Sequence, residues 1–329
     1  MNLNKNNIDN VLELLAQEYE VYVPGTKGDI KRYIPWQKGC ADLEGDNTVL
    51  PPKDILFPKT EKMYSYKIGD PNVITELSEV PKRAIVGIRA CDVHSIECMD
   101  KVFIQEGYTD TFYSNRRNAG LLVAISCPHA SDNCFCDSMG LDPNNAPGAD
   151  IMMTDGGDYY TVAANTEKGK AVLDSWKAFL EEGETAKSDT KCTLKADYRE
   201  DLPKQLVANF KNDEIWNRYS KACLGCGTCS FICPTCYCFD VNLDKNGKEG
   251  TEFRCWDSCM FSDYNRIAGG INARPTKKER LRNRFLHKLS YFRERYDTCL
   301  CAGCGRCISK CPSHIDIAEF INYASEVCR

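Results

Sequence analysis

A cysteine motif that occurs twice constrains this chain more than any other feature of its sequence. The motif is CxxCxxCxxxCP, and it spans residues 223–234 and again residues 301–312. The glycines between the cysteines also recur, in LGCGTC and AGCGRC. Cysteines at gaps of two, two and three residues, followed by proline, form the ligand run of proteins that hold two [4Fe–4S] clusters.

The spacing also assigns the ligands. Three thiolates on one tightly turning segment reach three irons of a cubane, and the fourth cysteine of each run ligates the other cluster. The intervening glycines let the backbone fold around the cluster, where its amides donate hydrogen bonds to the sulfurs. We therefore expect two [4Fe–4S] clusters, the first held by Cys223, Cys226, Cys229 and Cys311 and the second by Cys233, Cys301, Cys304 and Cys307.

Disulfides and zinc are the main alternatives for so many cysteines. The N-terminus, MNLNKNNIDNVLELL, lacks an export signal, and no run approaches the ~18–20 apolar residues of a membrane span. The sequence thus predicts a cytoplasmic chain, in which thiols stay reduced and 21 cysteines favour metal ligation. Zinc sites pair two CxxC units across a longer gap, a pattern that two complete runs do not match.

Charge and missing motifs narrow the function further. The 42 Lys and Arg residues against 47 Asp and Glu give a net charge of −5, which argues against nucleic acid or a membrane surface as the main partner. We find no strand followed by GxGxxG, no GxxxxGK[ST] loop and no histidine pair at metal-site spacing. We therefore expect the clusters to carry single electrons, with no catalytic residue on this chain.

The character of the sequence changes near residue 205. Before it, apolar or alternating runs predict strands at 21–23, 63–67, 84–88, 121–125 and 159–164. Helical patterns cover 8–18 and 171–183 in this part. After residue 205 the chain is rich in cysteine and in helical patterns, including one over 315–327. We therefore expect an α/β domain at 1–205 and a helical domain with both clusters at 206–329.

Longer stretches of the sequence resemble a known family. They are ILFPKTEKMYSYK (55–67), GIRACDVHSIECMD (87–100), SDNCFCDSMG (131–140), ACLGCGTCSFICPTCYCFDV (222–241), WDSCM (256–260), RLRNRFLHKLSYF (280–292) and CAGCGRCISKCP (301–312). Over nearly its whole length the chain resembles the iron–sulfur subunit of anaerobic sulfite reductases. More distantly, it is similar to the beta subunits of sulfhydrogenases.

This resemblance implies a fold and a task. The C-terminal domain would be an all-helical dicluster ferredoxin. The chain would relay single electrons from a flavin subunit that oxidises NADH or NAD(P)H to a sirohaem subunit that reduces sulfite to sulfide. Flavin and sirohaem would lie on those partner subunits. The alternative is the electron-transfer subunit of a sulfhydrogenase or NAD(P)-linked hydrogenase. A redox-sensing module is a weaker hypothesis, because a sensor needs one labile cluster.

Eight of the 21 cysteines are assigned in this way, which leaves thirteen. Four that fall in family-like stretches either hold a third cluster in the N-terminal domain or simply pack there: Cys91, Cys127, Cys134 and Cys136. Four more lie near the first run, where packing around the clusters is favoured over a separate metal site: Cys236, Cys238, Cys255 and Cys259. No family motif accounts for Cys40, Cys98, Cys192, Cys299 or Cys328.

A basic segment, TKKERLRNRFLHKLSYFRERY at 276–296, lies between the two runs. Thr276 and Glu279 form a capping box that predicts a helix start. The apolar residues on one helical stripe are Leu281, Phe285, Leu289 and Phe292, and the basic residues off it are Arg280, Arg284, Lys288 and Arg295. These cations could dock an acidic partner or offset the negative charge of the clusters. A solvated helix face is the more common use of such a run.

Overall fold

The structure is a computed structural model of the chain that describes residues 1–71, 74–75 and 80–328. It contains two compact units, each assembled from segments that are separate in the sequence. The first unit consists of Met1–Leu56, Val80–Lys195 and Ala302–Gly305, and the second of Phe57–Glu79, Ala196–Cys301 and Arg306–Arg329. The domain boundary that the sequence analysis expects at residue 205 stays a prediction.

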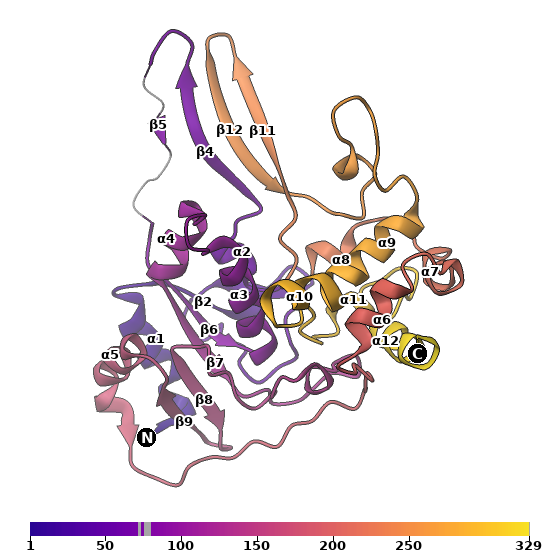
Figure 1. Cartoon of the computed structure of the whole chain (residues 1–329). Coiled ribbons are helices and arrows are strands. Elements are labelled where there is room, and N and C mark those ends of the chain that lie inside the picture. Colours follow the sequence, from indigo (N-terminus) through magenta and orange to yellow (C-terminus); the bar gives the residue numbers. More distant parts are fainter. Residues whose placement is uncertain (72–73, 76–79, 329) are drawn as a thin grey trace. The chain divides into compact units, whose positions relative to one another are not determined.

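A mixed sheet of eight strands is the centre of the first unit (Figure 1). The strand order is β10 (Leu180–Glu181), β1 (Asn2–Asn4), β9 (Tyr159–Ala164), β8 (Ile151–Asp155), β7 (Gly120–Ile125), β6 (Arg83–Ile88), β2 (Glu20–Lys27) and β3 (Ile30–Pro35). The four strands β2, β6, β7 and β8 run parallel, and the outer strands are antiparallel to their neighbours. β7 is buried along its whole length, as expected of a parallel strand covered on both faces.

Helices cover this sheet. They are α1 (Ile8–Ala16), α2 (Lys53–Leu56), α3 (Ala90–Phe103), α4 (Thr111–Ala119) and α5 (Glu167–Ser175). Val11 of α1 and Val172 of α5 share one core cluster with Val86 and Val123 of the central strands. Helix α3 contacts β7. Helix α3, which carries Cys91, follows β6, and Cys127 follows β7. Polar groups and thiols therefore lie at the carboxyl ends of these parallel strands.

The structure differs from the expected helix at 171–183. Helix α5 begins earlier, at the Thr166 cap, and ends at Ser175; a short 3₁₀ turn (Lys177–Phe179) and strand β10 follow. Trp176 is 1% exposed and belongs to the core cluster. Leu180 then pairs with Leu3 of β1. The apolar residues that suggested a longer helix therefore serve the core and the edge of the sheet.

The second unit combines helices with a four-stranded antiparallel sheet (Figure 1). Its helices are α6 (Leu202–Ala208), α7 (Asp213–Ser220), α8 (Thr228–Phe231), α9 (Lys277–Leu286), α10 (Phe292–Tyr296), α11 (Arg306–Ser309) and α12 (Ile317–Val327). A π-helical segment (His287–Tyr291) joins α9 to α10. The sheet has the order β11 (Phe239–Asn246), β12 (Glu249–Trp256), β4 (Thr60–Lys67) and β5 (Ile74–Thr75). The expectation of an all-helical C-terminal domain is therefore wrong.

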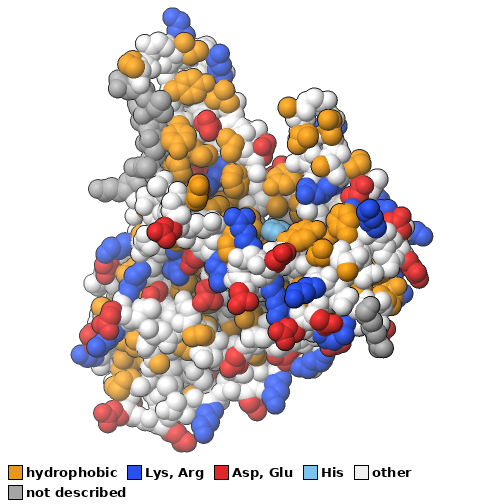
Figure 2. Space-filling model, viewed as in Figure 1, with side chains coloured by type: hydrophobic (Ala, Val, Ile, Leu, Met, Phe, Trp, Pro, Cys, Tyr) orange, Lys and Arg blue, Asp and Glu red, His pale blue; other side chains and the backbone are white. Residues whose placement is uncertain are grey.

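The sheet is built on a hairpin of β11 and β12, which follows the first cysteine run. Asn246 pairs with Glu249 across a two-residue turn, in which Gly247 has a φ of +60° that favours glycine. β12 then pairs with β4, which carries the 63–67 run that the sequence analysis placed in the α/β domain. Figure 2 shows hydrophobic side chains gathered over this sheet, and Val241 and Leu243 of β11 are about half exposed.

Candidate metal centres

One pocket in the second unit brings together cysteines from both copies of the motif. It spans about 490 Å³, part of which is open to solvent, and its walls include Cys223, Cys226, Cys229 and Cys311. These are the four ligands that the spacing assigns to the first cluster. Mainly apolar side chains complete the lining, among them Met260. Cys307, which the spacing assigns to the second cluster, also lines this pocket. The four thiols of the first set converge on one largely apolar space, which fits a [4Fe–4S] cluster held by four thiolates.

Glycines shape the ligand loops as the sequence predicts. Gly225 and Gly227 have φ angles of +72° and +74°, a backbone region that residues with a side chain rarely adopt. The amide of Gly225 donates a hydrogen bond to the Cys223 sulfur at 3.4 Å. In the second run, Gly303 and Gly305 also have positive φ angles. Both runs therefore use the same turn chemistry to bring their cysteines together.

The pocket opens to solvent at one edge. Cys226 is exposed, and the neighbouring Leu224 is 66% exposed. A hydrogen bond between the Cys226 sulfur and the Thr228 hydroxyl lowers the pKa of the Cys226 thiol. Cys223, in contrast, is buried. The first ligand set therefore lies just beneath the surface, with Cys226 nearest to solvent.

The second ligand set is distributed over both units. Cys233, Cys301 and Cys307 belong to the second unit, and Cys304 belongs to the loop Ala302–Gly305 of the first. Within the second unit, the Lys288 ammonium donates to the Cys233 sulfur at 3.2 Å. A hydrogen bond with Cys236 holds the pKa of Cys233 well below its usual range, and the charge of Lys288 lowers it further. This favours the thiolate, which is the form that binds metal.

Arg284 and Lys288 are buried cations on the helix between the two runs. Arg284 lines the pocket of the first set and donates to the Cys229 carbonyl at 3.4 Å. Burial by itself lowers the pKa of both side chains, but the neighbouring sulfurs raise each pKa well above its usual value: Cys229 and Cys307 act on Arg284, and Cys233 and Cys236 act on Lys288. Both side chains therefore stay charged beside the cysteines.

The basic segment is thus not a solvated face. Arg280, Arg284 and Lys288 are 8% exposed or less, and of the four off-stripe cations only Arg295 is exposed. His287 adds no charge, because burial and the nearby Lys288 lower its pKa to about 4. Arg284 and Lys288 lie beside cysteine sulfurs, as the charge-offset hypothesis expects, whereas Arg280 donates to the Arg274 and Pro275 carbonyls.

Other cysteines in the second unit form hydrogen bonds with their neighbours. The hydrogen bond to Cys233 raises the pKa of Cys236 well above its usual value. A hydrogen bond to Cys238 does the same for Cys259. Cys255 accepts from Asn242 on the hairpin at 3.5 Å. The Cys236 thiol thus hydrogen-bonds to a predicted ligand, as packing around the clusters would require.

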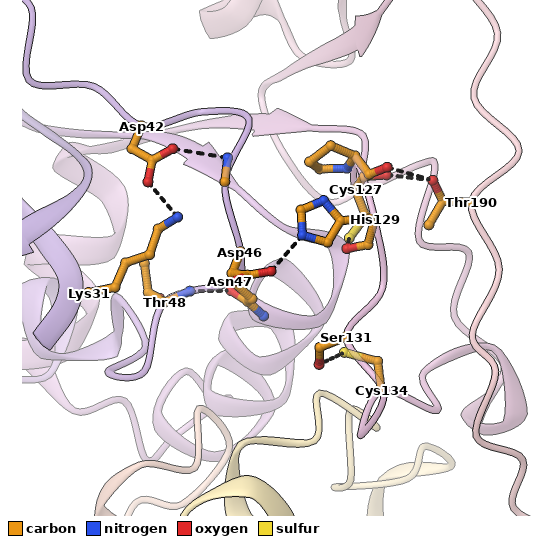
Figure 3. Close-up of polar contacts among 12 residues, drawn as sticks. Lys31, Asp42, Asp46, Asn47, Thr48, Cys127, His129, Ser131, Cys134 and Thr190 are labelled. Carbon is orange, nitrogen blue, oxygen red and sulfur yellow. Dashed lines mark hydrogen bonds and ion pairs between the residues drawn. The ribbon is translucent and has the colours of Figure 1, made fainter.

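A second group of thiols lies in the first unit. Cys134, Cys136 and Cys192 form one buried cluster, in which the Cys136 and Cys192 sulfurs are 3.5 Å apart. Figure 3 shows Cys127 and Cys134 in the loop that follows β7, with the Thr190 hydroxyl donating to the Cys127 carbonyl at 2.7 Å. Burial raises the pKa of Cys127, and the nearby Cys134 and Cys192 raise it further.

Cys91 and Cys192 have different surroundings from those that the sequence suggested. Cys91 lies in the first turn of α3, and its sulfur accepts a hydrogen bond from the Asn47 amide at 3.6 Å. Cys192, which matched no motif, lies against Cys136 from a position 56 residues away in the sequence. No local spacing signals such a contact. Among the described residues, no three His, Cys, Asp or Glu side chains are grouped closely enough for a single metal ion.

Comparisons with known proteins identify the family. Residues 222–315 match the 4Fe-4S dicluster domain family. The chain is 31% identical over 294 residues to sulfhydrogenase 2 subunit beta of Pyrococcus furiosus, and the alignment covers 86% of this chain and 85% of that protein. The chain belongs to the sulfhydrogenase beta-subunit family. No solved structure matches it.

Family membership confirms the coarser expectations. The dicluster match spans both cysteine runs, so this beta-subunit homologue is an iron–sulfur electron-transfer subunit that binds [4Fe–4S] clusters. It also confirms the more distant of the two resemblances, the one to sulfhydrogenase beta subunits. Among the helices of the described residues, none has the length and hydropathy needed to cross a bilayer.

Proposed function

We propose that this chain relays single electrons in a cytoplasmic reductase complex, from a flavin subunit that oxidises NADH or NAD(P)H to a sirohaem subunit that reduces sulfite to sulfide. The observation that carries the relay is the pocket where Cys311 of the second run joins three cysteines of the first. Sharing ligands in this way keeps two clusters close together. When bound, each cluster takes up and releases one electron.

The residues of the chain have distinct roles in this proposal. The first cluster is held by Cys223, Cys226, Cys229 and Cys311, and the second by Cys233, Cys301, Cys304 and Cys307. Arg284 and Lys288 offset the negative charge of the thiolates in a buried setting. The exposed edge at Cys226 and Leu224 is where a partner subunit would approach the first cluster.

Two observations bear on the identity of the terminal partner. The motif resemblance to the iron–sulfur subunit of anaerobic sulfite reductases supports sulfite as the electron acceptor. The sulfhydrogenase relative favours a second candidate, in which the same relay serves a hydrogenase. Neither a nucleic acid nor a membrane is proposed as a partner.

Anaerobic purification of the tagged chain with its natural partners distinguishes these candidates. A co-purifying subunit with sirohaem absorption supports sulfite reduction, whereas a nickel-containing subunit supports the hydrogenase. The chain itself should hold at least about eight irons and eight sulfides, four of each per cluster. Colourless protein without an electron paramagnetic resonance signal after dithionite reduction would contradict the relay altogether.

A matched pair of variants tests the first ligand set. Cys226→Ala should lower the iron content by about four per chain, because one cubane loses a ligand. Cys40→Ala should keep the full content, because Cys40 lies outside every thiol group described above and accepts a hydrogen bond from the Gln37 amide. Equal iron contents in the two variants would remove Cys226 from the ligand set.

A further inference from the structure

We infer that Cys127, Cys134, Cys136 and Cys192 hold a third iron–sulfur cluster in the first unit, beside the loop that carries Cys304. The inference rests on the proposed function, because it adds a cluster to the same relay. It replaces Cys91, which the sequence suggested, with Cys192 as the fourth ligand.

The four thiols come from three segments that other contacts hold in place. Thr190 donates to the Cys127 carbonyl at 2.7 Å, which ties the segment before Cys192 to the loop after β7. The backbone amide of Cys192 donates to Asp137 at 3.2 Å, next to Cys136. Lys195 forms an ion pair with the same carboxylate at 2.5 Å. The thiols therefore converge because the backbone is fixed on both sides of them.

The surroundings suit thiolate ligands. Arg89 is 4% exposed and is held by carbonyl oxygens, including that of Ser126 at 3.3 Å. Because Ser126 directly precedes Cys127, this guanidinium brings a buried positive charge close to that ligand. The Ser131 hydroxyl lies 3.1 Å from the Cys134 sulfur, within hydrogen-bonding distance (Figure 3). A buried cation and a hydroxyl near the sulfurs resemble the roles of Lys288 and Thr235 beside Cys233.

Spacing favours an iron–sulfur cluster over zinc. Structural zinc sites take cysteines in pairs with two to four residues between them. Here Cys134 and Cys136 have one residue between them, and Cys127 and Cys192 stand alone in the sequence. A cubane needs only four thiolates at its corners and imposes no such pairing.

The position of the group connects it to the second cluster. The Phe135 amide donates to the Gly303 carbonyl at 2.8 Å, and the Cys134 sulfur lies 3.7 Å from the Cys304 carbonyl oxygen. A Cβ at Gly303 would meet the Cys136 Cα at 2.6 Å, so only glycine permits this approach. Cys304 is a ligand of the second cluster in our assignment. An electron passed between the two sites oxidises one cluster and reduces the other, with no proton or bond change.

Metal analysis of the anaerobically purified full-length chain tests the inference. The unaltered protein should contain about twelve irons and twelve sulfides, four of each for three clusters. Cys192→Ala should lower both to about eight, and Cys91→Ala should leave both at about twelve. Electron paramagnetic resonance of the reduced Cys192→Ala protein should lack one of the cluster signals.

The possible failures are distinguishable. About eight irons in the unaltered chain would overturn the third cluster and leave the two-cluster relay intact, and so would zinc or a Cys136–Cys192 disulfide in its place. Twelve irons with no loss in Cys192→Ala would overturn the ligand assignment. If Cys192→Ala does not fold, the iron content of the unaltered chain and of Cys134→Ser still decides the question. Only the absence of all iron would reject the proposed function as well.

Discussion

Lys288 illustrates how a single residue prepares this chain for its cofactor. A buried ammonium is costly unless a charged partner lies nearby. Here Lys288 is 3% exposed and donates to the sulfur of Cys233 and, at 2.8 Å, to the hydroxyl of Thr235. The lysine and the thiolate therefore stabilise each other's charged form. Because Lys288 stays positively charged beside Cys233, we expect it to raise the reduction potential of the second cluster.

Lys288→Met should lower the reduction potential of the second cluster, because a positive charge stabilises the reduced, more negative state. At ~7 Å and an effective dielectric constant of ~20, one charge contributes about 2 kcal/mol, which corresponds to roughly 100 mV for one electron. A redox titration followed by electron paramagnetic resonance measures this shift. Lys278→Met is the control. Lys278 lies on α9, just before the segment of Lys288, and it pairs with the exposed Asp213. An unchanged potential in an iron-replete Lys288→Met protein would show that the lysine does not tune the cluster.

The residues that the sequence predicted have their partners nearby in the sequence, whereas those that it did not predict meet partners that are far away in the sequence. The pocket cysteines could be predicted because cluster ligation imposes spacings of two and three residues within one run. Cys192 could not, because its neighbour Cys136 is 56 residues away and only tertiary folding joins them. The burial of Arg284 was left open for a similar reason. A run of charges is usually solvated, and the sequence does not reveal that its other face meets thiolates.

At the scale of elements, the hairpin β11–β12 is the main departure from the expected helical domain. Its strand pattern is weak because charged residues alternate with only a few apolar ones in FDVNLDKN. The strand that completes its sheet, β4, lies far upstream. A buried ion pair joins the two: Arg254 Nε donates to Glu61 at 2.7 Å, and the guanidinium lies over the Phe57 and Phe239 rings.

Arg254→Met should destabilise this sheet by about 3–5 kcal/mol, because it leaves the Glu61 carboxylate buried without its charged partner. Hydrogen exchange of the β12 amides measures the free energy of local opening. Replacing both residues, as Glu61→Leu with Arg254→Met, should recover most of the loss, since no buried charge then remains. Arg266→Met, which removes an exposed pair with Asp263, should change little. If Arg254→Met and Arg266→Met had equal effects, the buried pair would not be what secures the sheet.

At the scale of the whole molecule, the two units exchange segments along the sequence. The expected domains 1–205 and 206–329 assumed that a change in composition marks a structural boundary. The structure instead assigns Phe57–Glu79 to the unit of the cysteine runs and Ala302–Gly305 to the unit of the large sheet. Strand patterns alone could not reveal this, because the 63–67 run suits an antiparallel hairpin as well as an α/β sheet.

The exchange of segments predicts that residues 206–329 do not form an intact unit by themselves. Without β4, β12 has an open edge and Arg254 lacks Glu61, so the hairpin should open. After anaerobic reconstitution, trypsin should cleave the fragment rapidly at Lys245, Lys248 and Arg254. The same fragment with residues 57–71 joined to its N-terminus by a flexible linker should resist cleavage at these sites, because the added strand restores both the edge pairing and the carboxylate. Equal protection of the two fragments would show that β4 is dispensable and would support a domain boundary at residue 205.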